Sequence, residues 1–273
     1  MSLKNAKVLT ISQYIHPFTD GTGMAKVARQ LPQGILEGGN EIRVFMPKFG
    51  SINERRHQLH EVIRLSGMNL IVNDTDHALL IKVASVPSAR MQVYFIDNEE
   101  YFKRKAEVVD DDENFFPDND ERALFFCRGV LETVRKLGWS PDIIHCHGWM
   151  TSFIPLYVRH YFNDDPHFED AKLIFTAYDE KSEPLDKDLP KKLALEGFGK
   201  DVLKGLKTTT DDLQKFAMGL SDAVVKGSPK LSRGMETSIK AMEKPVLGFH
   251  QEPNERLEAH LDFYQGVLEA ALV

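Results

Sequence analysis

The chain has 273 residues, 42% of them hydrophobic and 27% charged, a composition that can bury a substantial core in one or two globular domains. Its formal net charge of -7 argues against an electrostatic grip on a nucleic-acid backbone, so we expect no nucleic-acid partner. No apolar run is long enough to span a bilayer, the N-terminus lacks a secretory signal, and Cys127 and Cys146 lie in apolar patterns typical of reduced core residues. We therefore expect a cytoplasmic protein with no membrane partner.

Short apolar runs alternate with amphipathic stretches from the start of the chain. The pattern predicts a strand over 7–12, a loop with glycine and proline, a helix over 24–37 and a strand over 41–46. Short strands separated by turn residues follow between 61 and 98, which indicates antiparallel additions or an excursion at the sheet edge. The acidic run over 108–121 is typical of a solvated loop.

The second half continues the alternation. Predicted helices cover 119–137, 151–161 and 211–218, one begins at Ser228 and Pro229, and the last begins at 252; predicted strands cover 142–146, 172–177, 223–226 and 246–249. The whole pattern predicts an α/β fold with a mostly parallel, doubly wound sheet covered by helices on both faces.

In such sheets, ligands bind at the carboxyl ends of the strands, where helix amino termini point backbone donors at the crevice. The loop over 15–26 holds Gly21 and Gly23, which permit close approach of an anion or a sugar. A plain turn into the helix explains these glycines equally well. The sequence lacks both GxGxxG and GxxxxGK[ST], so neither a dehydrogenase nor a P-loop enzyme is indicated.

The segment DIIHCHGW over 142–149 ends a predicted strand. Strand alternation directs His145 and His147 to one face and Cys146 to the other, and no third ligand is placed by spacing, so we expect no metal site. One histidine then belongs to the core while the other contacts ligand. Trp149 is either a packing anchor for the next helix or a flat platform for a sugar ring.

These segments together carry a family resemblance. The chain is similar to the amino-terminal half of the bacterial glycogen and starch synthases, the ADP-glucose-type enzymes of glycosyltransferase family five. The matching segments are KVLTISQYIHPFTDGTGMAKVARQLPQGI, EIRVFMPKFGSI, VYFIDNEEYFKR, DNDERALFF, PDIIHCHGWMTSFIPLYV and KLIFTAYD, which follow one another in family order over nearly the whole chain.

The resemblance implies a single Rossmann-like lobe over 1–273, of the amino-terminal type of the two-domain GT-B fold, with the donor-binding lobe absent. It implies an α-glucan or maltooligosaccharide acceptor, ADP-glucose as the donor, and no cofactor. Its implied site residues are Asp20, Gly21 and Gly23 in the phosphate loop; Lys26, Asp118, Asn119, His145, His147 and Trp149 on the acceptor side; and Tyr178 at the catalytic position.

The chain departs from the family at four positions. Asp20 stands where the family has a lysine that answers the donor phosphate, and Lys26 stands where the family has an acid. Gly148 replaces an aspartate before Trp149, and Tyr178 replaces the histidine near the reacting sugar. An acid repels a diphosphate, and a phenol is a poor proton shuttle near neutral pH. We therefore predict that the chain alone does not synthesise glucan.

Three hypotheses remain open. The first is a non-catalytic member that binds α-glucan or a partner protein, for which the aromatic residues Tyr101, Phe115, Phe116 and Trp149 would provide sugar stacking if exposed. The second is a glucosyltransferase that a separate donor-domain protein completes, or that accepts another donor. The third is a scaffold whose bare cleft face is covered by self-association, as in a homodimer.

Overall fold

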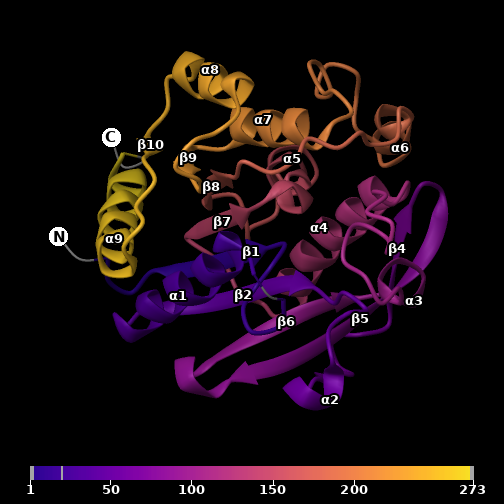
Figure 1. Cartoon of the computed structure of the whole chain (residues 1–273), viewed down its shortest axis with the longest axis horizontal. Helices are drawn as coiled ribbons and strands as arrows, with labels where there is room; N and C mark the ends of the chain where they lie inside the picture. Colours follow the sequence, from indigo (N-terminus) through magenta and orange to yellow (C-terminus); the bar gives the residue numbers. More distant parts are fainter. Residues whose placement is uncertain (1–2, 20, 271–273) are drawn as a thin grey trace.

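The computed structural model describes residues 3–19 and 21–270, and one sheet runs through them (Figure 1). Its parallel strands are β1 (Lys7–Ser12), β2 (Glu41–Pro47), β6 (Met91–Asp97), β7 (Ile143–His147), β8 (Lys172–Ala177), β9 (Ala223–Lys226) and β10 (Val246–Leu247). Its antiparallel strands are β3 (His60–Glu61), β4 (Met68–Val72) and β5 (Thr75–Val86). The strand order is β10-β9-β8-β7-β1-β2-β6-β5-β3, with β4 paired to β5.

The expected antiparallel excursion at the sheet edge is confirmed. It consists of β3, β4 and β5, whereas β6 returns to a parallel register beside β2, with Val44 opposite Val93. The chain thus leaves the parallel sheet after β2 and re-enters it at the next position.

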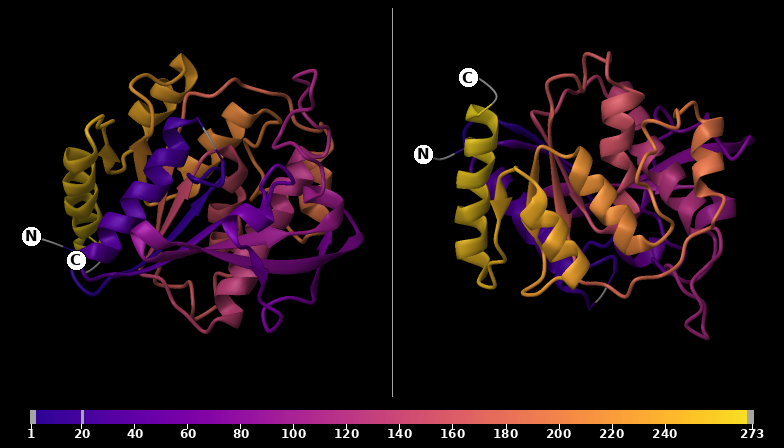
Figure 2. Two further views of the ribbon diagram at one scale, coloured as in Figure 1. Left: turned by 60° about the horizontal axis from the view of Figure 1, so that its bottom comes forward. Right: turned by 90° about the horizontal axis from the view of Figure 1, so that it is seen from above.

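Helices pack on both sides of the sheet, as expected for a doubly wound fold (Figures 1 and 2). On one side, α1 (Gly23–Glu37) packs against α9 (Pro253–Glu269); on the other, α5 (Phe153–His160) packs between α4 (Asn119–Lys136) and α7 (Thr210–Leu220). The shorter helices are α2 (Glu54–His57), α3 (Glu99–Phe102), α6 (Leu189–Leu195) and α8 (Arg233–Ala241), with 3-10 turns η1 (Pro87–Ala89) and η2 (Trp149–Thr151). Within the described residues, no helix is long and apolar enough to cross a bilayer.

Helix α1 shows how local chemistry sets its start and how packing constrains its middle. The Oγ1 atom of the N-cap residue Thr22 accepts a hydrogen bond from the N–H of Ala25, which fixes the first turn. Farther along, a Cβ atom on Gly34 would lie 2.4 Å from Cδ2 of Leu257 in α9. A larger residue there would force the Leu257 side chain to shift, so the glycine suits the close approach of the two helices.

Two sequence-based expectations need correction. The helix expected to begin at Ser228 and Pro229 instead begins at Arg233, because Ser232 serves as its N-cap while the hydroxyl of Ser228 accepts a hydrogen bond from the N–H of Asp179. Among the aromatic residues offered for sugar stacking, Tyr101 and Trp149 are only 4% and 3% exposed. Both are packed into the core, which a local pattern does not reveal.

The sheet has its topological switch point at β1. The chain leaves β1 toward β2 on one side, while β7 lies on the other side in register, with Ser12 opposite His147. Because the connections diverge here, the carboxyl ends of β1 and β7 leave a crevice between the loops that follow them.

Candidate functional site

A crevice of about 280 Å³ opens at the carboxyl ends of β1, β7 and β8. Five segments that are far apart in the sequence converge on it: the end of β1, the loop before α4, the turn after β7, the loop after β8 and the start of α7. They contribute, among others, Tyr14, Phe115, Trp149, Glu180, Lys181 and Thr210. This combination of aromatic walls and a few polar groups is typical of a small-molecule site.

The aromatic wall is built in two layers. Trp149 follows β7 through Gly148 and is buried, and the half-buried ring of Phe115 lies over it with ring centroids 5.5 Å apart. A backbone bridge between Val109 and Phe115 holds the loop that carries this ring. Trp149 therefore packs within the protein and supports Phe115, the more accessible of the two rings.

Gly148 gives this turn a backbone shape that other residues resist. Its φ of 84° and ψ of 164° fall in a region that is essentially restricted to glycine. A Cβ atom there would also lie 2.7 Å from Cε of Met24. The residue that stands at the family's aspartate position thus lies in a turn whose backbone shape and packing both favour glycine.

The charged groups of the crevice are predominantly acidic. Glu180 is half-buried and makes no hydrogen bond or ion pair with the described residues, and its Oε2 atom is inaccessible to solvent. Burial, together with the charge of Asp211, raises the pKa of Glu180 to about 7. The ammonium group of Lys181 is engaged by Glu183 at 2.6 Å. Among the described residues, the crevice therefore offers no unpaired cation to a diphosphate.

The two histidines of β7 lie on one side of the strand, with ring centroids 4.0 Å apart. In His145, Nδ1 lies 2.5 Å from the hydroxyl of Tyr264 in α9, and Nε2 lies 2.6 Å from Oγ1 of Thr176. Both ring nitrogens are thus engaged inside the protein, and the residue has no polar atom left for a ligand. Burial holds the pKa of His145 well below its ordinary range.

His147 is also fully buried. Its Nδ1 lies 3.0 Å from the hydroxyl of Tyr178, and its Nε2 has no hydrogen-bond partner among the described residues. Burial and the neighbouring His260 lower the pKa of His147 to about 3, so the imidazole is neutral at physiological pH. The described residues contain no group of three potential ligands that could hold a metal ion.

Tyr178 lies on the side of the sheet that α9 covers, outside the crevice. Together with His260 it lines a small cavity between the ends of β8 and β9 and α9, and burial raises the pKa of its phenol. Gly227 makes room for its ring, because a Cβ atom there would lie 2.5 Å from Cε1 of Tyr178. The residue at the family's histidine position is therefore a buried partner of His147.

The first loop lies at the amino end of α1. Gly21 has a φ of 92°, and neither Gly21 nor Gly23 faces any atom that would obstruct a side chain. Asp20, expected in the same loop, lies outside the described residues. The glycines leave the amino end of the helix accessible, and the structure assigns them no contact.

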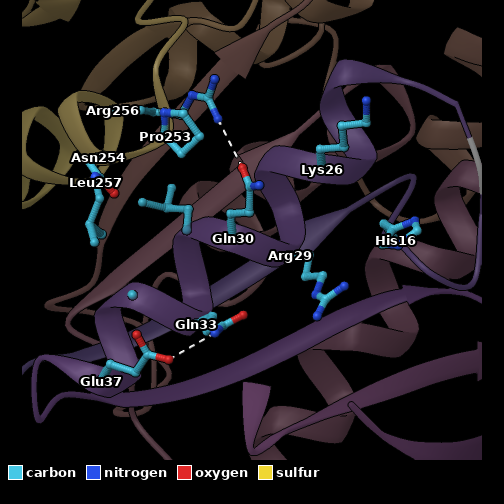
Figure 3. A pocket seen from close by; sticks show the side chains of 12 residues that line it. His16, Lys26, Arg29, Gln30, Gln33, Glu37, Pro253, Asn254, Arg256 and Leu257 are labelled. Carbon is cyan, nitrogen blue, oxygen red and sulfur yellow. Dashed lines mark hydrogen bonds between the residues drawn. The ribbon is translucent and has the colours of Figure 1, made fainter. Parts of the chain in front are cut away.

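Lys26 is exposed and lines a separate groove of about 570 Å³ between α1 and α9 (Figure 3). The same groove receives Arg29, Gln30 and Arg256, and Nη1 of Arg256 donates to Oε1 of Gln30 at 3.3 Å. In Figure 3 the charged ends of Lys26 and Arg29 point in different directions. Their charges therefore do not converge on a common point.

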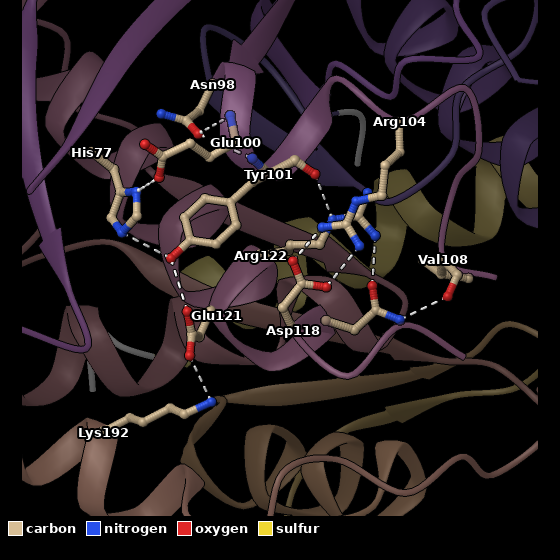
Figure 4. A network of polar contacts seen from close by, with 11 residues as sticks. His77, Asn98, Glu100, Tyr101, Arg104, Val108, Asp118, Glu121, Arg122 and Lys192 are labelled. Atoms are coloured by element: carbon tan, nitrogen blue, oxygen red, sulfur yellow. Dashed lines mark hydrogen bonds and ion pairs between the residues drawn. The ribbon is translucent and has the colours of Figure 1, made fainter. Parts of the chain in front are cut away.

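Asp118, Asn119 and Arg122, from the matching segment DNDERALFF, belong to a polar network at the start of α4 (Figure 4). Asp118 forms an ion pair with Arg104, and the Asn119 amide donates to the carbonyl oxygen of Val108 at 2.8 Å. The fully buried Arg122 donates from Nη1 to Oδ1 of Asn119 at 2.6 Å. These bonds fix the loop that carries Phe115, so the network positions a wall of the crevice.

The Arg122 guanidinium also lies against the rings of Phe49, Phe102 and Phe116, with its central carbon 5.2 to 5.7 Å from their centroids. Burial and the nearby Arg104 lower its pKa to about 10. Even so, the group stays charged near neutral pH, and its aromatic surroundings contribute to its stabilisation.

The sequence does not indicate a buried role for Lys192, because a lysine in a charged stretch is ordinarily exposed. Its Nζ atom lies 2.8 Å from carboxylate oxygens of Asp120, Glu121 and Asp186, and it joins α6 to α4 (Figure 4). Burial disfavours the charge, but the three carboxylates outweigh it and raise the pKa of Lys192. His260 and Tyr264 in α9 were likewise missed, since only the folded chain brings them to β7.

The expected site residues thus occupy three places instead of one pocket. Trp149 lines the crevice, and Asp118 and Asn119 fix the loop that carries Phe115. Gly21, Gly23 and Lys26 lie at the start of α1. His145, His147 and Tyr178 are buried between the sheet and α9.

Comparison with known proteins gives concordant results. A family model described as the starch synthase catalytic domain matches residues 7–244. The chain is 37% identical over 221 residues to a glycogen synthase of Chlorobium phaeobacteroides, which covers 81% of this chain and 45% of that protein. It is 35% identical over 260 residues to a glycogen synthase of Chlorobaculum tepidum, which covers 88% of this chain and 51% of that protein. The chain therefore spans about half the length of the curated relatives it matches.

A solved structure, the catalytic domain of starch synthase IV from Arabidopsis thaliana bound to ADP and acarbose, matches with a TM-score of 0.71. The match covers 90% of this chain and 51% of that chain at 20% identity. At this identity the likeness concerns the fold, and it confirms the expected doubly wound α/β architecture.

Proposed function

The chain belongs to the starch synthase catalytic domain family, and from this membership we propose that it is an acceptor-side lobe that binds α-glucan in the crevice at the carboxyl ends of β1 and β7. We further propose that the isolated 273-residue chain binds this glucan without transferring glucose to it.

The crevice itself carries the proposal. It combines the aromatic side chains of Tyr14 and Phe115 with hydrogen-bonding groups from Glu180 and Thr210. The faces of a sugar ring present C–H groups that pack on aromatic rings, while its hydroxyls need donors and acceptors at the edge. The curated relatives named above are glycogen synthases, which makes a glucan the natural ligand to test.

We propose that the chain alone does not transfer glucose because a buried tyrosine, Tyr178, stands at the family's catalytic position. Glucosyl transfer from a nucleotide sugar passes through a cationic transition state, and its departing diphosphate needs preorganised positive charge and hydrogen-bond donors. Tyr178 stands at the family's histidine position, its phenol has a raised pKa, and it is bonded to His147 away from the crevice. The crevice is also acidic, so ADP-glucose is expected to bind far more weakly than a neutral glucan.

The proposal also includes the location of the chain in the cell and its protein partners. Cys127 and Cys146 are buried free thiols, which fits a reducing cytoplasm. A homodimer and a separate donor-domain protein are the partners to look for, by measuring mass in solution and by adding candidate donor domains to the transfer assay described below.

Calorimetric titration of the purified chain with maltoheptaose tests the binding proposal. We expect saturable binding that weakens at least fivefold in Phe115→Ala, because this half-buried ring covers Trp149 in the crevice. The matched control is Ile63→Ala, which removes a side chain that is 83% exposed and lies outside the crevice. Equal affinities in wild type and Phe115→Ala, or no binding by the wild type, would contradict the proposal.

A transfer assay tests the second part. The chain is incubated with labelled ADP-glucose and maltoheptaose, and the label in the oligosaccharide is measured. We expect no incorporation above a boiled control. Steady elongation by the wild-type chain would show that Tyr178 does not prevent turnover.

A further inference from the structure

Glu180 stands out among the crevice residues because its carboxyl group has no partner in the described part of the chain. It follows β8 by three positions, and it lines the crevice together with Tyr14 and Trp149. None of the described residues forms a hydrogen bond or ion pair with its carboxylate, although Oε2 is inaccessible to water. A buried carboxylate oxygen in this state is costly, and proteins ordinarily satisfy such atoms.

The surrounding charges do not supply a partner. Asp211 at the start of α7 repels the charge of Glu180, and the nearby Lys181 is engaged by Glu183. Glu113 adds another acid on the opposite loop. None of the described residues therefore supplies a hydrogen-bond donor to this carboxyl group, and the crevice is the side from which a ligand can supply one.

On this basis we propose that Glu180 is the residue that recognises the glycan, with its carboxylate accepting a hydrogen bond from a sugar hydroxyl in the crevice. The inference rests on the proposed function, since it assigns the polar contact within the same site. It also sets the ligand class: a neutral polyhydroxylated ring supplies the missing donor, whereas a diphosphate would add negative charge to an acidic site.

The geometry is compatible with this role. Glu180 is half-buried and lines the crevice, so a sugar hydroxyl would approach its carboxyl group from the crevice side, whereas Oε2 is inaccessible to solvent. A ring packed on Phe115 would present its hydroxyls at the edge of the aromatic wall, where Glu180 also lines the space. Phe115 then supplies the stacking face and Glu180 the directional contact.

If the carboxylate of Glu180 accepts a sugar hydroxyl, sugar binding depends on pH. Burial and Asp211 raise the pKa of Glu180 to about 7, so the free crevice holds this carboxyl half-protonated near neutral pH. A donating hydroxyl favours the ionised form, so binding releases a proton and affinity rises with pH. The other titratable or charged groups around Glu180 are Tyr14, Glu113, Tyr178, Lys181, Glu183 and Asp211.

The size of the effect follows from the ionised fraction. If only the ionised carboxylate accepts the hydroxyl, that fraction rises about tenfold between pH 6 and pH 8 for a group titrating near 7. The affinity for maltoheptaose is expected to rise by the same factor.

The test is calorimetric titration of the whole chain with maltoheptaose at pH 6, 7 and 8, in two buffers of different ionisation enthalpy so that released protons are counted. For the wild type we expect about tenfold tighter binding at pH 8 than at pH 6, with up to one proton released. Glu180→Gln is expected to bind about tenfold more weakly at pH 8 and to lose the pH dependence. Glu113→Gln, an exposed acid in the same crevice, is the matched control and should keep that dependence.

The outcomes separate the two proposals. Wild-type binding that Glu180→Gln leaves unchanged at every pH would overturn the role of Glu180 and leave glucan binding standing. Affinity that falls with pH would overturn it too, because the carboxyl would then act as a donor. No wild-type binding at any pH would overturn the proposed function itself.

Discussion

The hydroxyl of Tyr264 lies 2.5 Å from Nδ1 of His145, although 119 residues separate them in the sequence. This contact ties α9 to the central strand β7. The other ring nitrogen of His145 is hydrogen-bonded to the hydroxyl of Thr176 in the neighbouring strand β8. The last described helix is therefore joined to the middle of the sheet by a buried polar chain as well as by apolar packing.

Tyr264→Phe should reduce the free energy of unfolding by about 1–3 kcal/mol, since it leaves a buried imidazole nitrogen without its partner. Urea denaturation followed by fluorescence measures the change. Tyr94→Phe is the control, because Tyr94 stacks on Phe45 and no hydrogen bond of its hydroxyl is seen among the described residues. A loss as small as that of the control would show that the contact does not stabilise the fold.

The buried histidines predict destabilisation in acid. Burial lowers the pKa of His260 to about 4, whereas an unfolded histidine titrates near 6.5, so the unfolded state takes up a proton first as the pH falls. The contribution of His260 is complete above pH 6.5 and is lost below it by about 1.4 kcal/mol per pH unit, down to about pH 4.

His260→Gln removes this titration. Between pH 6.5 and 5, its unfolding free energy should depend on pH less steeply than that of the wild type, by about 1.4 kcal/mol per pH unit. His60→Gln, at an exposed position in β3, should follow the wild-type slope. Identical slopes in wild type and His260→Gln would mean that His260 is not kept neutral by burial.

Glu180 predicts the opposite pH dependence. Its pKa is raised from 4.5 to about 7 in the folded chain, so the folded state binds the extra proton and loses stability as the pH rises through this window. Glu180→Gln cannot ionise, and it should be more stable than the wild type by about 1–3 kcal/mol at pH 8 but not at pH 5. Thermal unfolding at the two pH values measures this, and an equal effect at both would refute it.

Lys192 forms ion pairs with Asp120, Glu121 and Asp186, and we expect its replacement to lower the stability of the fold strongly. The adjacent Lys191 provides the control. Lys192→Met leaves the fully buried Asp120 without its cation and should cost about 3–5 kcal/mol. Lys191→Met removes an ammonium group that is 79% exposed and paired with Asp188, and should change stability by less than about 1 kcal/mol.

Adding Asp120→Asn to Lys192→Met removes the stranded charge as well, and should recover part of the loss. Chemical denaturation compares the three variants. If the double variant were no more stable than Lys192→Met, the buried charge would not be the source of the cost.

Restoring the family residue beside Trp149 should destabilise this chain. Gly148→Asp places a side chain at φ 84° and ψ 164° and against Cε of Met24, at an expected cost of about 1–3 kcal/mol. Met24→Ala combined with Gly148→Asp should relieve the steric part and leave the backbone strain. A double-mutant cycle by denaturation measures the coupling, and strictly additive effects would exclude a clash with Met24.

Local sequence patterns predicted most strands and helices because burial in this fold follows short-range periodicity. The strands over 172–177 and 223–226 were placed with their observed ends, and the helix over 119–137 with an error of one residue. Prediction failed at Ser228, where two serines compete as helix caps. The hydroxyl of Ser228 is used by Asp179, a residue 49 positions away.

For the candidate site, the sequence placed Trp149 beside a strand end and led to the family that the comparisons establish. It did not indicate Glu180, because a single acid in a charged stretch has no pattern that distinguishes a buried carboxyl from an exposed one. Nor did it show that Tyr178 faces α9, since that depends on the space left by Gly227, just after the neighbouring strand β9.

The amino-acid sequence by itself determined the alternation of strands and helices, the α/β class and the family, because these depend on residue types at fixed short spacings. Tertiary structure alone decided which polar side chains are buried and which lack a partner: His145 became a core residue through Tyr264, and the carboxylate of Glu180 has no partner among the described residues. The physical reason is that burial and hydrogen-bond partners are set by segments that meet only after the chain has folded.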